Sequence, residues 1–103
     1  MTAQDNPRVE FRRAVERGNL LVAETTVREI GVVSLREALE LTALIAKRDR
    51  WRCERYCLRW LVRWLEETSP QLDQVVLAAG ALNALGGPGH AGALALLRSL
   101  SGA

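Results

Sequence analysis

The chain has 103 residues, of which 49% are hydrophobic and 25% are charged, and its 14 basic and 12 acidic residues give a net charge of +2. This length predicts a single domain, residues 1–103, that buries a core without disulfides or a metal. No apolar run is long enough to span a membrane, and the N-terminal segment lacks the apolar stretch of a signal peptide. We therefore expect a cytoplasmic protein with reduced cysteines and no membrane contact.

Capping residues and glycines predict two short helices at the beginning of the chain. Asn6 can cap the first helix, which has Pro7 at its first position and ends at Gly18. Asn19 can cap the second helix, and Gly31 ends it.

The next two helices are longer. Ser34 and Glu37 have the spacing of a capping box, which begins a third helix running to about Lys47. Asp49 can cap a fourth helix, which ends near Glu67.

Proline and glycine mark the last two helices. Ser69 and Pro70 predict the start of a fifth helix, and the sequence GGPG at 86–89 breaks the chain and is expected to be a turn rather than a phosphate-binding loop. A sixth helix follows from about His90 to Leu100. No segment alternates apolar and polar residues over a useful length, so no strand is expected.

Short connections place consecutive helices antiparallel to each other. The predicted fold is therefore all-α, with six helices in three antiparallel helical hairpins that form a compact bundle or a short solenoid-like stack. A weak internal repeat supports hairpins as the unit, because Arg28, Arg59 and Arg98 occupy the same place in the second helix of each pair.

The hairpin layout resembles a short α-solenoid of the TPR or HEAT type across all three pairs. The tryptophan and proline signature of TPR repeats is missing, so the resemblance implies the layout and not the peptide-binding groove of that family. The run FRRAVERGNLLVAETTVREIGVVSLREALELTALI and the pattern RY-x2-RWL at Arg55–Leu61 also resemble small actinobacterial helical proteins. That resemblance implies no activity.

The fourth helix carries the most unusual charge pattern. Five arginines recur at intervals of three and four residues and are predicted to line one helical face: Arg48, Arg52, Arg55, Arg59 and Arg63. Guanidinium groups bind carboxylates and phosphates and stack on aromatic planes, so this basic stripe could bind an acidic protein or a nucleic acid. The alternative is a solvated face, neutralised in place by pairs such as Arg50–Glu54 and Arg63 with Glu66 or Glu67.

The opposite face of the same helix holds Cys53, Cys57, Trp60 and Trp64. We expect the tryptophans in the core, which would make the fourth helix the central element of the fold. The cysteines are expected to be buried thiols, because a zinc site requires more ligands than they and His90 supply. His90 is expected to pack against its loop, and no catalytic group, cofactor or metal site is predicted.

Residues 68–103 carry only two formal charges, on Asp73 and Arg98. A terminal helical hairpin usually has a polar outer face. Self-association would cover the apolar face of this segment, and the residues predicted to form the contact are Val75, Val76, Leu82, Leu96 and Leu97. A monomer with an alanine-rich surface is the alternative.

These observations favour a small non-enzymatic protein-interaction or assembly module that forms a homo-oligomer through its charge-poor C-terminal helices. The alternative function is a nucleic-acid-binding helical module that uses the basic stripe, although a net charge of +2 is low for such a protein.

Overall fold

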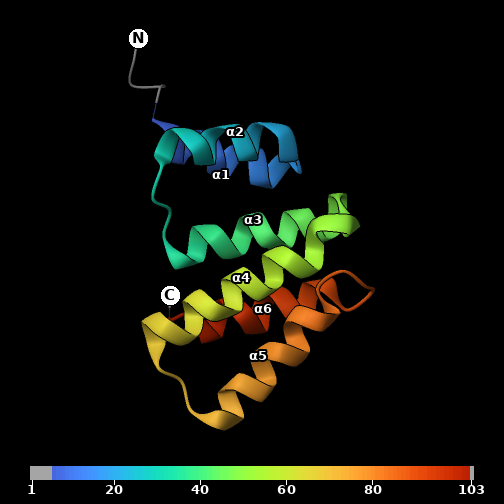
Figure 1. Ribbon diagram of the computed structural model, residues 1–103. Helices are drawn as coiled ribbons and strands as arrows, with labels where there is room; N and C mark the ends of the chain where they lie inside the picture. Colours follow the sequence, from blue (N-terminus) through green and yellow to red (C-terminus); the bar gives the residue numbers. More distant parts are fainter. Residues whose placement is uncertain (1–5, 103) are drawn as a thin grey trace.

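The computed structural model describes residues 6–102 and contains six helices, with no strand in that range (Figure 1). The all-α prediction is therefore confirmed. The helices are α1 (Pro7–Arg17), α2 (Leu20–Ile30), α3 (Leu35–Arg48), α4 (Arg50–Thr68), α5 (Leu72–Ala84) and α6 (His90–Leu100). No helix in the described part of the chain has the length and apolar character needed to cross a membrane.

The helices pair as three hairpins, α1–α2, α3–α4 and α5–α6, which follow one another along the long axis of the molecule (Figure 1). The first hairpin packs mainly on α3, and the third contacts both α3 and α4. The molecule measures 48 × 27 × 20 Å, which is the shape of a short stack of hairpins.

Helix α3, and not α4 as expected from the sequence, is the central element. Its face with Leu39, Ala43 and Ala46 belongs to the core shared with α4, α5 and α6. Its opposite face, with Leu41, Leu44 and Ile45, belongs to a second core shared with α1 and α2. Because α3 is buried on two sides, it joins the first hairpin to the rest of the fold.

The tryptophans of α4 lie in the larger core, as predicted. Trp60 and Trp64 are 2% and 1% exposed, and their rings stack with centroids 5.9 Å apart. The Trp60 Nε1–H donates to the carbonyl oxygen of Leu35 at 3.0 Å, and the Trp64 Nε1–H donates to that of Leu100 at 3.0 Å. Each indole thus fills the core and also binds a carbonyl at a helix end. The carbonyl of Leu100, at the end of α6, has no hydrogen-bond partner within its own helix.

Most helix ends follow the predicted capping. The side chains of Asn6 and Asn19 accept hydrogen bonds from the amides of Arg8 and Val22, and Gly18 has a left-handed φ of 71° that ends α1. The Ser34–Glu37 capping box forms in both directions, at 3.0 and 2.8 Å.

Two predicted caps are wrong. Asp49 makes no capping hydrogen bond at α4, because its carboxylate instead binds Arg52. Ser69 has a left-handed φ of 46° and ends α4 rather than beginning the next helix. Helix α5 begins two residues after Pro70, where the backbone N–H of Gln71 donates to the side chain of Gln74.

Ion pairs connect the hairpins where the apolar contacts end. Glu40 on α3 accepts hydrogen bonds from Arg36 on the same helix and from Arg98 on α6, the latter through two nitrogens at 2.8 Å. Burial alone raises the pKa of Glu40, but the hydrogen bonds and charges of Arg98 and Arg36 outweigh it and lower the pKa below its usual value.

We predict that Trp60→Ala lowers the free energy of unfolding by about 3–5 kcal/mol, because it leaves a cavity and removes the bond to Leu35. The matched control is Trp51→Ala, since Trp51 is 96% exposed and its loss removes no core contact. Thermal and denaturant unfolding measure both. Equal stability of the two variants would place Trp60 outside the core.

We predict that the Glu40–Arg98 pair stabilises the fold at neutral pH and not in acid. A carboxylate whose folded pKa is lowered contributes stability above its unfolded pKa, and this contribution is lost as the pH falls through the folded value. Glu40→Gln should therefore destabilise the protein by about 1–2 kcal/mol at pH 7 and by progressively less below about pH 4.3. Denaturant titrations across pH test this, with Glu29→Gln on the exposed surface as the control; a constant difference from wild type would refute it.

Candidate functional site: the surfaces of helix α4

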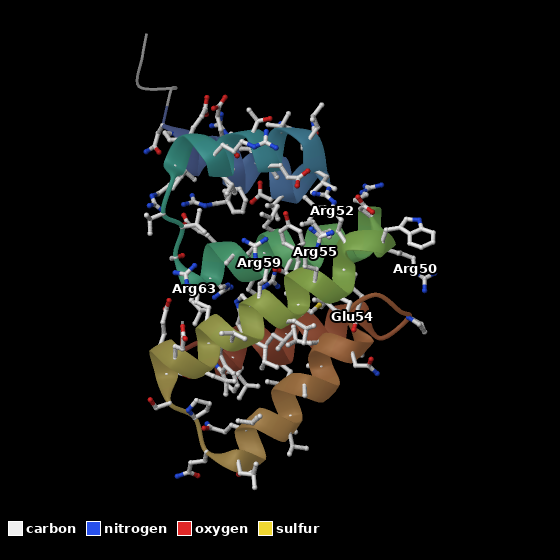
Figure 2. All side chains as sticks on the ribbon, viewed as in Figure 1. Arg50, Arg52, Glu54, Arg55, Arg59 and Arg63 are labelled. Carbon is white, nitrogen blue, oxygen red and sulfur yellow. The ribbon has the colours of Figure 1, made fainter. Side chains whose placement is uncertain are left out.

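The basic stripe is split between two helices. Arg48 lies in the last turn of α3, where its guanidinium closely approaches Gly18, so it does not belong to the helical face predicted for it. The four other arginines lie along the edge of α4 that faces α2 and α3: Arg52, Arg55, Arg59 and Arg63 (Figure 2).

Two of these arginines are bound within the chain. Arg52 forms ion pairs with Glu24 of α2 at 2.5 Å and with Asp49 at 2.7 Å, and these hydrogen bonds raise its pKa above the usual arginine value. Arg63 binds Glu67 at 2.5 Å and donates to the carbonyl oxygen of Val33 in the α2–α3 link at 2.7 Å. These two therefore hold the first two hairpins together.

Arg55 and Arg59, between them, are exposed and form no ion pair with any described residue. The guanidinium of Arg59 lies 5.2 Å from the centre of the Tyr56 ring, which orients it by a cation–π contact. The predicted Arg63–Glu67 pair forms, whereas Arg50 and Glu54 form no salt bridge. Arg55 and Arg59, in the middle of the basic stripe, are therefore the two arginines that remain available to bind a partner.

A groove of about 360 Å³ runs between α2 and α4 beside these arginines. Arg28, Arg59 and Arg63 line it, together with Tyr56 and an apolar floor that includes Leu41. Glu24 lines the same groove and, with Arg52, neutralises one of its ends. The groove can accept a carboxylate, but its net positive charge is modest.

The second surface of α4 is apolar. Leu58, Val62 and Leu65 follow one another at helical spacing and are 54%, 54% and 36% exposed. Helix α5 also exposes large apolar side chains, among them Leu72 and Val76. Most of the exposed large apolar side chains of residues 6–102 lie on these two helices.

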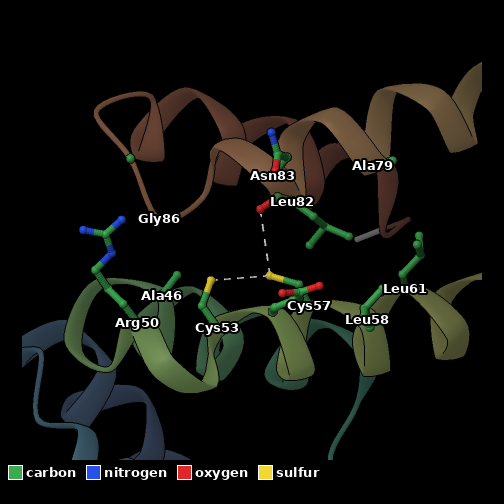
Figure 3. Close-up of a pocket in the computed structure, with 12 residues that line it drawn as sticks. Ala46, Arg50, Cys53, Cys57, Leu58, Leu61, Ala79, Leu82, Asn83 and Gly86 are labelled. Atoms are coloured by element: carbon green, nitrogen blue, oxygen red, sulfur yellow. Dashed lines mark hydrogen bonds between the residues drawn. The ribbon is translucent and has the colours of Figure 1, made fainter.

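A cavity of about 590 Å³ opens between α4 and α5 next to this surface (Figure 3). Leu58 and Leu61 line it from α4, and Ala79 and Asn83 line it from α5. Because α5 diverges from α4 toward its N-terminal end (Figure 1), the two helices leave apolar side chains uncovered between them.

The residues predicted for self-association are divided by the fold. Leu82 and Leu97 are 5% and 0% exposed in the core of the subunit, so they lie on no outer surface and their assignment is corrected here. Val75 and Leu96 are half-buried against the same core, and Val76 is exposed. The C-terminal segment is poor in charge because α5 and α6 bury these leucines against α3 and α4.

The apolar stripe on α4 was missed by the sequence analysis, although its signal is present there. Leu58, Val62 and Leu65 are spaced by four and three residues on the face opposite Trp60. Helix α4 is apolar on two sides, and one of these sides is left exposed by the residues from 6 to 102.

The two thiols line the α4–α5 cavity between Arg50 and Leu58 (Figure 3). The Sγ atoms of Cys53 and Cys57 are 3.8 Å apart, much longer than a disulfide bond (Figure 3). Burial raises the pKa of Cys57 to about 12, with a smaller contribution from the neighbouring Cys53. His90 places its Nδ1 2.6 Å from the carbonyl oxygen of Leu85, to which it donates. No group of three metal-binding side chains occurs within residues 6–102.

We predict that Cys57 reacts slowly with thiol reagents in the folded protein, because its buried thiol resists forming the thiolate that reacts. At pH 8, mass spectrometry should find at most one label per native chain within minutes, on Cys53, and two labels in denaturant. Cys53→Ser should remove the native labelling. Rapid labelling of Cys57 in that variant would show that the thiol is accessible and reactive.

Comparison with known proteins supplies no relative whose site could be transferred to this chain. No protein-family model matches it, and no curated protein and no solved structure matches it. The resemblances to α-solenoids and to small actinobacterial helical proteins therefore stay predictions.

Proposed function

We propose that this protein is a small, non-enzymatic assembly module of the cytoplasm that self-associates through the outer face of α4 and α5. The observation that carries the proposal is the set of exposed apolar side chains on two helices that share a cavity: Leu58, Val62 and Leu65 on α4, and Leu72 and Val76 on α5. Exposed apolar patches of this kind, bordered by charged residues, typically mark protein-binding surfaces. The proposed contact thus retains α5, as predicted from the sequence, but uses α4 instead of α6 as the second helix.

Helix α6 contributes less exposed apolar surface than its composition suggests. Leu97 is fully buried, Leu94, Leu96 and Leu100 pack partly against the core, and Arg98 is bound to Glu40. The exposed positions of α6 are small residues such as Ala91, Gly92 and Ala95. Its outer surface therefore offers little apolar area to a partner, whereas that of α4 offers three branched side chains.

The basic stripe supports a protein partner better than a nucleic acid. Arg52 and Arg63 are engaged by carboxylates of the chain itself, which leaves Arg55 and Arg59 as its exposed cations. Nucleic-acid binders neutralise many phosphates at once with extended basic surfaces. A short basic edge beside an apolar stripe instead matches the charged rim of a protein interface.

We predict that the wild-type protein has about twice the 11.4 kDa mass of one chain or more in light scattering behind size exclusion, decreasing on dilution. The double variant Val62→Gln/Val76→Gln removes two exposed apolar side chains from the proposed face and should be a monomer at the same concentration. The matched control is Leu21→Gln/Val32→Gln, because these residues are at least as exposed but lie elsewhere.

A wild-type monomer at all concentrations would refute self-association. An oligomer that is equally weakened by both double variants would place the contact elsewhere. Titration with random-sequence RNA and DNA at low salt tests the alternative: tight binding that weakens steeply with salt and is lost in Arg55→Glu/Arg59→Glu would favour the nucleic-acid function.

A further inference from the structure

Leu58, Val62 and Leu65 form a stripe whose spacing of four and three residues is that of a helix seam. A shallow hollow of about 430 Å³ lies on this side of α4, lined by Leu58 and Val62 and by three charged residues, Arg59, Arg63 and Glu66. The apolar stripe is thus bordered by charges of both signs. A helix that covers it must place an acidic side chain near the arginines and a basic side chain near Glu66.

The charges lie on one flank of the stripe. Arg59 and Glu66 are seven residues apart, which is close to two helical turns, so they occupy the same side of α4. Both are exposed, and neither forms an ion pair with another residue of the range 6–102. Arg63, by contrast, is already bound to Glu67.

The order of charges along α4 is the reverse of what its dipole favours. The helix has no acidic residue in its first turn and no basic residue in its last, while Arg50, Arg52 and Arg55 lie in its N-terminal half and Glu66 and Glu67 near its end. Within one helix this order is unfavourable. Against an antiparallel copy, however, the acidic end of each helix can face an arginine near the middle of the other.

We propose that two copies pair through an antiparallel contact between their α4 helices, with Arg59 of each copy facing Glu66 of the other. This rests on the proposed self-association and specifies its geometry. Seam packing sets Val62 opposite Leu65 of the second copy, with the two-fold axis near the middle of the segment between them. Position 59 then faces position 66 across the same flank, and symmetry forms this ion pair twice.

The same arrangement gives a place to three further exposed residues. Arg55 lies just beyond the C-terminal end of the second α4, on the side where the helix dipole favours a cation. The other flank of α4 is the side that faces α5, so Leu72 and Val76 of each copy lie beside the second α4 and extend the apolar contact. The interface thus comprises four helices, α4 and α5 from each copy.

The test exchanges charges between copies. Arg59→Glu alone sets two acids against each other at both symmetric contacts, and Glu66→Arg alone sets two bases against each other. Each should weaken dimerisation about tenfold, as measured by sedimentation equilibrium over a dilution series. An equimolar mixture of the two single variants, and the double variant Arg59→Glu/Glu66→Arg, should both regain affinity to within about threefold of wild type.

Recovery in the mixture also shows that the single variants fold, since a misfolded chain is not repaired by another. Arg13→Glu, an exposed arginine of α1, is the control and should leave dimerisation unchanged. If wild type dimerises and the mixture associates no better than its components, the antiparallel α4 contact is overturned while self-association stands. If wild type is a monomer, both proposals fail.

Discussion

The fold depends on the burial of α3 on two opposite sides. One side packs against the stacked tryptophans of α4 and the leucines of α5 and α6, and the other packs against the first hairpin. A helix of this kind has little surface left for charges, and its acidic residues Glu37 and Glu40 are used to bind Arg8 and Arg98 from neighbouring elements. Apolar contacts thus set the order of the hairpins, and ion pairs fix their edges.

Helix α4 can expose two different surfaces because α3 takes the central position. Its tryptophan face is fully used inside the subunit, and its arginine edge is partly used to hold the first hairpin through Glu24 and Val33. What remains is a narrow apolar stripe. The exposed Arg55 and Arg59 lie on one flank of this stripe, and the cavity shared with α5 lies on the other. The proposed contact uses this apolar stripe together with the exposed Arg59 beside it.

The sequence predicted the local structure well because each signal was local. The Ser34–Glu37 capping box, the caps at Asn6 and Asn19 and the inward face of Trp60 depend only on neighbouring residues. Failures arose where another contact competes with the expected one, as when the Asp49 carboxylate binds Arg52, which Glu24 of α2 also binds, instead of capping α4. The candidate site was found only in part, because Leu82 and Leu97 could be assigned to the core only once the packing of α5 and α6 was known.

The small second core has a consequence for how the molecule opens. The first hairpin packs around Phe11, Ala14 and Ala23 and joins the remainder mainly through α3. Stability in such an arrangement is distributed in cooperative units rather than uniformly, so α1 and α2 can detach together while the tryptophan core stays intact. Such detachment would break the Glu24–Arg52 pair and uncover Ile45 on the side of α3 that faces away from α5 and α6.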